Sequence, residues 1–203
     1  MLDPAHGGAD AGARGANGVL ESEVVLSFAS QARAALERQG LRVLLTRQGN
    51  ENPSFDDRSA VVNGQRGAIF ISFHISSTGP TGTARVYSLP PVSRASRPPS
   101  PTGTERTGLA LWDQAQDAYN VLSRRLAELV QIQLAQRFRG SPEVPATAAV
   151  RQLRTVAAPA IAIEISSVSV PNRNPLEQMA PALAEAIVRS VADFQTVYEP
   201  GAK

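Results

Sequence analysis

The sequence predicts an α/β fold, with a mostly parallel, twisted sheet flanked by helices on both faces and a single domain over residues 1–203. Two observations support this prediction. Short apolar runs typical of buried strands alternate with segments whose apolar residues recur at helical spacing. The chain of 203 residues, 42% of them hydrophobic, is also long enough to bury one substantial core.

The expected elements follow in chain order. Residues 2–6 are expected to end a strand, and the segment after Glu21 has the apolar spacing of a helix that stops at Gly40. Further strands are expected at 41–47, 68–74, 83–89 and 159–166, and further helices at 56–65, 113–138 and 176–194. The residues in 90–108 are rich in Pro, Ser and Arg, which predicts an exposed insertion loop without a core of its own.

Composition excludes several kinds of chemistry. The chain has no cysteine, so disulfides, thiolate ligands and a cysteine nucleophile are absent, and His, Asp and Glu are the remaining metal ligands. The net charge is only +2 and the arginines are scattered, so no nucleic-acid partner is expected. No apolar run is long enough for membrane insertion. No signal peptide is recognised, and because Met1 directly precedes a strand, the chain is expected to come from a longer precursor.

Polar residues stand at the carboxyl ends of three expected strands: His6, His74 and Glu164. Ligands bind at this edge of open parallel sheets, so these residues are expected to converge. Glu21 follows His6 at the far end of a glycine-rich loop that can fold back on itself. Two histidines and one carboxylate, with a fourth position left to water, form a known catalytic zinc arrangement. Glu164 then remains free as an acid or base.

The residue types alone leave structural roles open. A histidine at a strand end is more often a hydrogen-bonded structural residue than a ligand. Glu21 suits the first turn of a helix because the helix dipole favours negative charge there. Glu164 could form an ion pair with one of the arginines, for instance Arg154.

Several stretches match one known family in order and spacing. The first is LDPAHGGADAGARGANGVLE at 2–21, and the others are GLRVLLTR, RSAVVN, AIFISFH and PAIAIEIS. Together they resemble the zinc-dependent N-acetylmuramoyl-L-alanine amidases of the type-3 class, which cut peptidoglycan. The resemblance covers nearly the whole chain. Two departures stand out: Ala5 and Ser166 occupy positions where the family usually has glycine.

The resemblance implies roles for the four residues. His6, Glu21 and His74 are implied as the Zn²⁺ ligands, and Glu164 as the catalytic glutamate that takes a proton from a zinc-activated water and passes it to the leaving amine. The bond cut would join N-acetylmuramic acid to L-alanine in peptidoglycan. Arg14, in the glycine-rich loop, is a further candidate for binding a carboxylate of the peptide stem, against the alternative of a plain surface residue.

The same resemblance implies a periplasmic or extracellular, cell-wall location and leaves open whether a protein activator takes part. Two other functions remain open. One is a zinc peptidase acting on the peptide stem, although the HxxE and HExxH patterns of common zinc peptidases are absent. The other is a non-catalytic wall-binding module of the same fold, suggested by the altered segment after Glu164.

Overall fold

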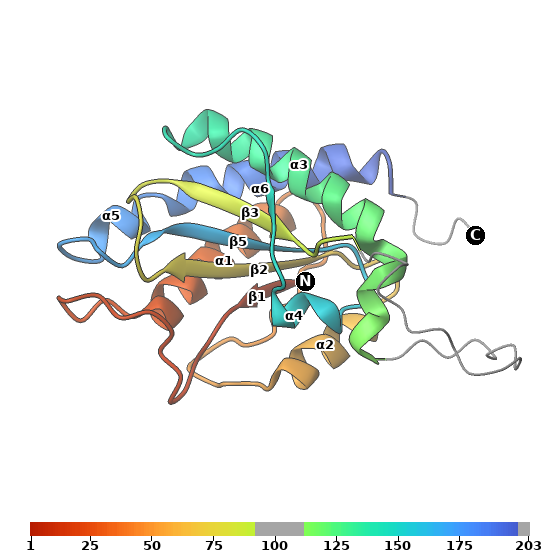
Figure 1. The fold of residues 1–203 in the computed structure, drawn as a ribbon, viewed down its shortest axis with the longest axis horizontal. Helices are drawn as coiled ribbons and strands as arrows, with labels where there is room; N and C mark the ends of the chain where they lie inside the picture. The colour runs from red at the N-terminus through yellow and green to blue at the C-terminus, as the bar shows by residue number, and fades with distance from the viewer. Residues whose placement is uncertain (92–111, 199–203) are drawn as a thin grey trace, which may run out of the picture.

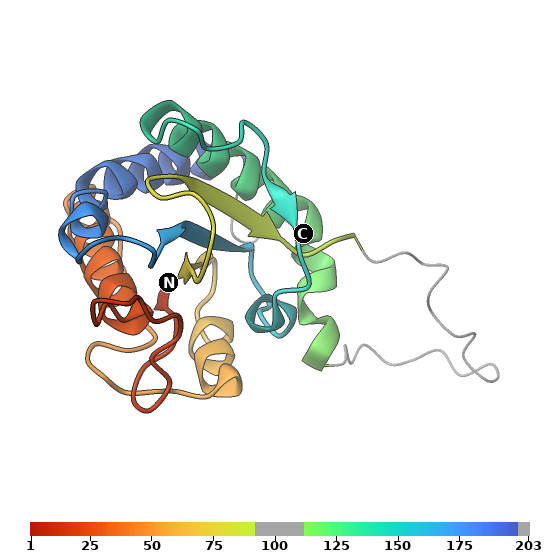
Figure 2. The same cartoon turned by 60° about the vertical axis from the view of Figure 1, so that its left-hand side comes forward.

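A five-stranded sheet runs through the centre of the computed structural model, which describes residues 1–91 and 112–198 (Figures 1 and 2). The strands lie in the order β1 (Leu2–Pro4), β2 (Phe70–Ser76), β5 (Ala160–Ser167), β3 (Ala84–Ser88) and β4 (Ala146–Thr147). The first three are mutually parallel, whereas β3 is antiparallel to β5, and β4 is parallel to β3. The predicted α/β class is confirmed, with a mixed sheet.

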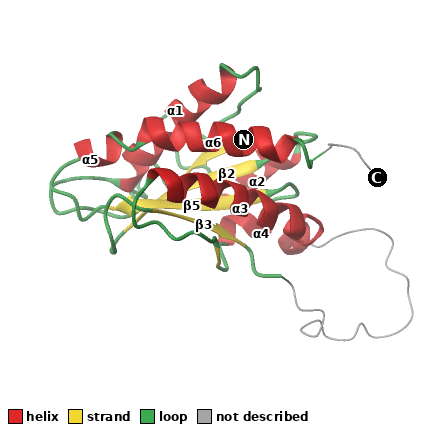
Figure 3. Ribbon diagram, turned by 90° about the horizontal axis from the view of Figure 1, so that it is seen from above, coloured by secondary structure: helices red, strands yellow, loops and turns green. Residues whose placement is uncertain are grey.

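Helices cover both faces of the sheet, as predicted. One layer consists of α1 (Glu21–Glu37), α3 (Asn120–Arg137) and α6 (Ala180–Gln195), with the short α5 (Asn174–Glu177) beside α1. Figure 3 shows α1 and α6 lying side by side above the strands. The other layer consists of α2 (Phe55–Asn63), α4 (Arg151–Arg154) and the 3₁₀ helix η2 (Trp112–Tyr119). Within the described ranges, no helix combines the length and hydropathy needed to cross a bilayer.

Alternation along β2 and β5 separates an apolar face from the face that carries the polar residues. The side chains facing the main core are Ile71, Phe73, Ile75, Ile161, Ile163 and Ile165. The opposite face starts with small or apolar residues packed against α2 and α4 and ends in His74 on β2 and Glu164 on β5. These two residues are direct partners in the strand register, so the sheet itself brings them together.

The expected strand at 41–47 is wrong. This segment runs beside β1 but joins it only by a bridge between Leu2 and Leu45, flanked by backbone hydrogen bonds. The physical reason is that β1 has only three residues and therefore offers little edge for a ladder. The segment is also half-exposed, so its apolar residues pack on one side only.

The expected helix at 113–138 is divided. Its first part is η2, and regular α-helix begins only at Asn120. The buried Gln116 amide donates to the carbonyls of Val156 and Ala158, which ties η2 to the chain before β5. Val121, one of the apolar residues whose helical spacing predicts this helix, is 75% exposed.

Other boundaries also differ from expectation. The helix at 176–194 is split, because α5 ends at Glu177 and α6 begins at Ala180. The short elements β4 and α4 carry no signal of their own in the sequence. The insertion at 90–108 falls, from residue 92 onward, outside the described residues, so it and the single-domain limits at 1–203 stay predictions.

Candidate metal centre

The structure brings His6, Glu21 and His74 together. His6 follows β1, Glu21 is the first residue of α1, and His74 lies near the end of β2. One potential ligand atom from each residue lies within 4.8 Å of the other two. The Oε1 atom of Glu21 is 3.2 Å from Nε2 of His6 and 3.2 Å from Nδ1 of His74. The imidazole rings meet edge to face with their centroids 5.5 Å apart.

Each histidine is oriented through the ring nitrogen that points away from this group. Nδ1 of His6 lies 2.9 Å from the carboxylate of Asp10. Nε2 of His74 lies 3.3 Å from the hydroxyl oxygen of Ser72, which donates its own proton to Asp3 and therefore accepts from the imidazole. These bonds leave Nε2 of His6 and Nδ1 of His74 free to act as ligands, which is the arrangement typical of metal-binding histidines.

Glu21 is buried, with 3% of its surface exposed, and hydrogen bonds hold its carboxylate in one orientation. Its two oxygens accept hydrogen bonds from the backbone amides of Ala13, at 2.7 Å, and Ile75, at 3.0 Å. Burial alone raises the pKa of Glu21, but the hydrogen bonds from both histidines and both amides outweigh it and hold that pKa well below its usual range. Glu21 is therefore a carboxylate at neutral pH. The donor set of two imidazoles and one carboxylate fits a divalent cation such as Zn²⁺.

The glycine-rich loop leaves no room for a side chain at Gly12. Its φ is +65°, and a Cβ atom there would lie 2.5 Å from Oε2 of Glu21 and 2.6 Å from Cδ2 of His6. His6 itself has a φ of +61°, an uncommon conformation for a residue with a side chain. Ala5 is not among the residues with positive φ, so the absence of the family's glycine there causes no strain.

Two buried guanidinium groups hold the backbone at residues 4–6 in place, and this backbone positions His6. Arg58 on α2 donates to Asp3, at 2.7 Å, and to the carbonyl of His6, at 2.9 Å. Arg47 donates to the carbonyls of Pro4 and Ala5. The Asp3 carboxylate thus links Arg58 to Ser72 and, through it, to His74.

Glu164 lines the same cavity as the three clustered residues, a hollow of about 570 Å³. Its Oε2 atom accepts a hydrogen bond of 3.0 Å from the hydroxyl of Tyr87 on β3. Burial, and then the charge of Glu164, raise the pKa of Tyr87, so this hydroxyl keeps its proton. Among the ion pairs of the described residues there is none between Glu164 and Arg154.

Several of these supporting residues escape sequence reasoning. Asp10 is four residues after His6 in an irregular loop, so no periodicity indicates that they meet. Tyr87 reaches Glu164 only because β3 is antiparallel to β5. Ser72 is the exception, because it precedes His74 by two residues and period-two alternation puts both on one face of β2. Arg14 is exposed in the glycine-rich loop and is not among the residues that line the cavity.

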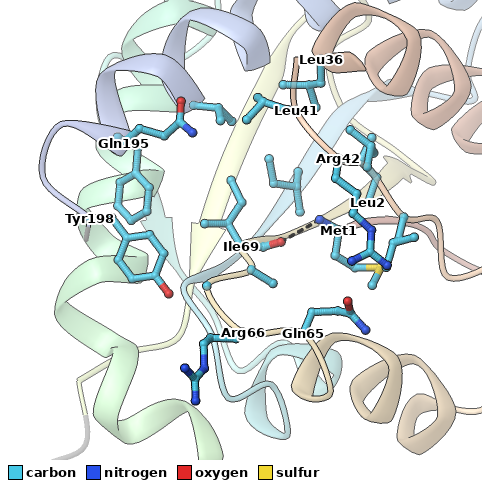
Figure 4. A pocket seen from close by; sticks show the side chains of 17 residues that line it. Met1, Leu2, Leu36, Leu41, Arg42, Gln65, Arg66, Ile69, Gln195 and Tyr198 are labelled. Atoms are coloured by element: carbon cyan, nitrogen blue, oxygen red, sulfur yellow. Dashed lines mark hydrogen bonds between the residues drawn. The ribbon is translucent and has the colours of Figure 1, made fainter. Parts of the chain in front are cut away.

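A larger hollow, of about 820 Å³, lies at the opposite end of the sheet (Figure 4). It is bounded by the starts of β1 and β2 and by the last turn of α6, with Met1, Ile69 and Tyr198 among its lining residues. None of the residues singled out for chemistry lines it. Size alone therefore does not indicate the functional site here.

Solved structures of N-acetylmuramoyl-L-alanine amidases share this fold. The amidase Ami1 from Mycobacterium smegmatis superposes with a TM-score of 0.72 and 22% identity, over 97% of this chain and 96% of that one. AmiC2 of Nostoc punctiforme gives a TM-score of 0.70 and 24% identity, over 96% and 95%. At these identities the likeness concerns the fold.

Sequence relatives carry the comparison further. AmiA of Salmonella typhimurium is 40% identical over 91 residues, which are 44% of this chain and 32% of that protein. LytC of Bacillus subtilis is 27% identical over 169 residues, which are 83% of this chain and 29% of that protein. The chain thus spans about a third or less of the length of these relatives. A family model described as N-acetylmuramoyl-L-alanine amidase matches residues 1–193. The chain therefore belongs to the N-acetylmuramoyl-L-alanine amidase family.

Proposed function

We propose that this chain is a zinc-dependent amidase that hydrolyses the bond between N-acetylmuramic acid and L-alanine in peptidoglycan. One observation carries the proposal. In this chain, which belongs to the amidase family, His6, Glu21 and His74 cluster in a cavity that Glu164 also lines. The polymeric wall substrate implies that the protein acts in the periplasm or at the cell wall.

His6, Glu21 and His74 would hold the zinc ion through two nitrogens and one oxygen. When bound, zinc supplies a Lewis acid that activates water and polarises the amide carbonyl. Glu21 is unsuited to proton transfer, because it is buried and both of its oxygens already accept backbone hydrogen bonds. Its task is to hold the ion.

Glu164 is the residue we assign to proton transfer. It accepts a proton from the attacking water and then gives it to the nitrogen of the departing L-alanine. Tyr87 donates to Oε2 of Glu164 and so keeps the carboxylate turned into the cavity. One carboxylate oxygen is thereby fixed, and in this proposal the other carries the proton.

Glu164→Gln tests the assignment while keeping the size of the side chain. The variant is expected to bind zinc normally and to lose roughly 10²- to 10⁴-fold in kcat, the usual contribution of a proton-transfer group. His74→Ala is expected to lose the metal itself. Glu185→Gln, on an exposed position of α6, serves as the matched control with unchanged activity. Full activity in Glu164→Gln contradicts the assignment.

Product analysis on purified muropeptides separates the three functions considered. An amidase releases the whole peptide stem from the lactyl group, whereas a peptidase cuts within the stem. A wall-binding module would sediment with sacculi without generating free amine. The presence of Glu164 beside the histidine cluster favours the first of these outcomes.

A further inference from the structure

A second hollow, of about 270 Å³, adjoins the candidate metal centre. Tyr87 and Glu164 line both hollows, so the two spaces meet at the carboxylate assigned to proton transfer. The remaining wall consists largely of hydroxyl side chains and one arginine. Its polar members are Ser76, Thr78, Thr83, Ser166 and Arg85.

Arg85 provides the positive charge of this hollow. It lies on β3 directly opposite Glu164 in the strand register, and its side chain is exposed. Among the residues that the structure describes, none forms an ion pair with it. Glu164 instead accepts the hydroxyl of Tyr87. The guanidinium of Arg85 also lies near the hydroxyl of Tyr87, where its hydrogen bond and its charge act to lower the pKa of that hydroxyl. Its other N–H donors form a planar fork, which matches the geometry of a carboxylate.

The wall around Arg85 is held by the bulge in β5. The register advances by two residues from His74 to Ser76 on β2 but by three from Glu164 to Ser167 on β5. The extra residue of β5 lies in this interval, which contains Ser166. Ser166 has a φ of +56°, and its hydroxyl oxygen accepts a hydrogen bond from the backbone amide of Gly82. The amide of Ser166 in turn donates to the carbonyl of Thr83. The turn before β3 is thus fixed against β5, and the hollow exists without a ligand.

We propose that this hollow binds a free carboxylate of the peptide stem, with Arg85 as its ionic partner; the proposal rests on the function proposed above. Glu164 lies where the two hollows meet, and its proton goes to the amine of the departing peptide. The second hollow lies on the side of Glu164 away from the histidines, and therefore on the side of the leaving group. Peptide stems carry free carboxylates there, whereas the amino sugars carry neutral hydroxyl and acetamido groups. The carboxylate nearest to the cut amine is the α-carboxylate of the second stem residue.

The test compares two N-acetylmuramoyl dipeptides that differ only in whether this α-carboxylate is free or amidated. Arg85→Gln is expected to lower kcat/KM on the free acid by about 10- to 100-fold, mainly through KM, which corresponds to losing a charged hydrogen-bonded pair. On the amide the variant and the wild type are expected to differ little. Arg85→Lys is expected to restore part of the preference for the acid. Arg189→Gln, on the exposed side of α6, is the matched arginine control.

Binding to the metal-free protein, measured by calorimetry with both dipeptides, keeps this test separate from catalysis. If the wild type fails to hydrolyse either dipeptide, the proposed function is contradicted, but a carboxylate preference that disappears in Arg85→Gln still supports the subsite. Equal losses on acid and amide, in KM and in binding, overturn the proposal, because Arg85 would then act only through Tyr87 and Glu164. No change on either dipeptide overturns it as well.

Discussion

Single hydrogen bonds decide which imidazole nitrogens face the candidate metal centre. Asp10 engages Nδ1 of His6, and Ser72 engages Nε2 of His74, so the two rings present different nitrogens to Glu21. A side chain that fixes the ring also raises its basicity as a ligand. The supporting residues are therefore expected to matter for metal affinity although they do not touch the ion.

Asp10→Asn tests this role of the second ring nitrogen. The asparagine amide is close in size to the aspartate carboxylate but lacks its negative charge, which favours a proton on Nδ1 of His6. Zinc affinity is therefore expected to fall by about 10- to 100-fold. Competition with a chromophoric chelator measures it. Asp193→Asn, at an exposed position late in α6, is the control that keeps wild-type affinity. Equal affinities for all three proteins contradict an orienting role for Asp10.

Gly12→Ala tests whether the loop must approach the ligands this closely. The new methyl group would lie 2.5 Å from Oε2 of Glu21, so the carboxylate or His6 must shift and zinc binding is expected to be lost or greatly weakened. Gly18→Ala is the matched control, because Gly18 also has positive φ, +75°, but has open space around it. Both variants carry the left-handed backbone cost of about 1–2 kcal/mol in the free energy of unfolding. Only Gly12→Ala is expected to lose the metal, and normal zinc binding by it contradicts the argument.

At the level of elements, the reversed direction of β3 has a functional consequence. A strand antiparallel to β5 brings Tyr87 and Arg85 alongside Glu164. The chain arrives at this edge through the turn that contains Gly82, which the bulge in β5 anchors. The carboxylate of Glu164, proposed for proton transfer, is thus flanked by His74 on one neighbouring strand and by Tyr87 on the other.

Tyr87→Phe tests what this neighbouring strand contributes. Loss of one hydrogen bond to a carboxylate is expected to lower kcat about tenfold, equivalent to about 1.4 kcal/mol, with zinc content unchanged. Because the hydroxyl acts on Glu164, the pH profile of kcat is expected to shift as well, which a purely structural defect would not produce. Tyr119→Phe changes a tyrosine that lines neither hollow and is the control. An unaltered kcat and pH profile in Tyr87→Phe contradict the positioning role.

Sequence patterns predict the elements that form the centre of the sheet. Strands such as β2 and β5 are long and largely buried, so their apolar runs are clear, and each carries a polar residue, His74 or Glu164, near its carboxyl end. The prediction of a strand at 41–47 is wrong because an apolar run indicates burial but does not show whether a neighbouring strand is available for a hydrogen-bonded ladder. The direction of β3 cannot be predicted from the sequence for the same reason, because it depends on strand pairing and not on local composition.

Over the whole molecule, one sheet collects residues that are far apart in the sequence. His6, Glu21, His74 and Glu164 gather near the carboxyl ends of β1, β2 and β5. The positions of polar residues at strand ends predict this for His6, His74 and Glu164, whereas Glu21 reaches the group from the start of α1, after the glycine-rich loop. The larger hollow at the amino ends of the same strands has no such residues. What topology does not provide is the fine geometry, because Asp10, Gly12 and Tyr87 meet the cluster through loop shape and strand direction.

Metal binding and stability of the whole protein are expected to respond to pH in opposite directions. In the metal-free protein, hydrogen bonds that His6 donates to Glu21 and to Asp10 raise its pKa from 6.5 to about 9, against the effect of burial. Because this folded pKa lies above the unfolded value, protonated His6 stabilises the fold fully below pH 6.5, and this stabilisation is lost as the pH rises through 9. A metal needs neutral His6, so binding near pH 7 releases a proton and zinc affinity is expected to rise about tenfold per pH unit toward 9.

Thermal unfolding of the metal-free and zinc-loaded protein between pH 6 and 8.5 measures both trends. The Tm of the metal-free form is expected to fall with rising pH, while the increase in Tm caused by a fixed free zinc concentration grows, because ligand binding stabilises the folded state by mass action. Asp10→Asn removes one of the groups that raise the pKa of His6 and is expected to shift both trends to lower pH. A zinc-induced Tm shift that is constant across this range would show that His6 is not protonated in the metal-free site, and the coupling between His6, Glu21 and Asp10 would then have to be abandoned.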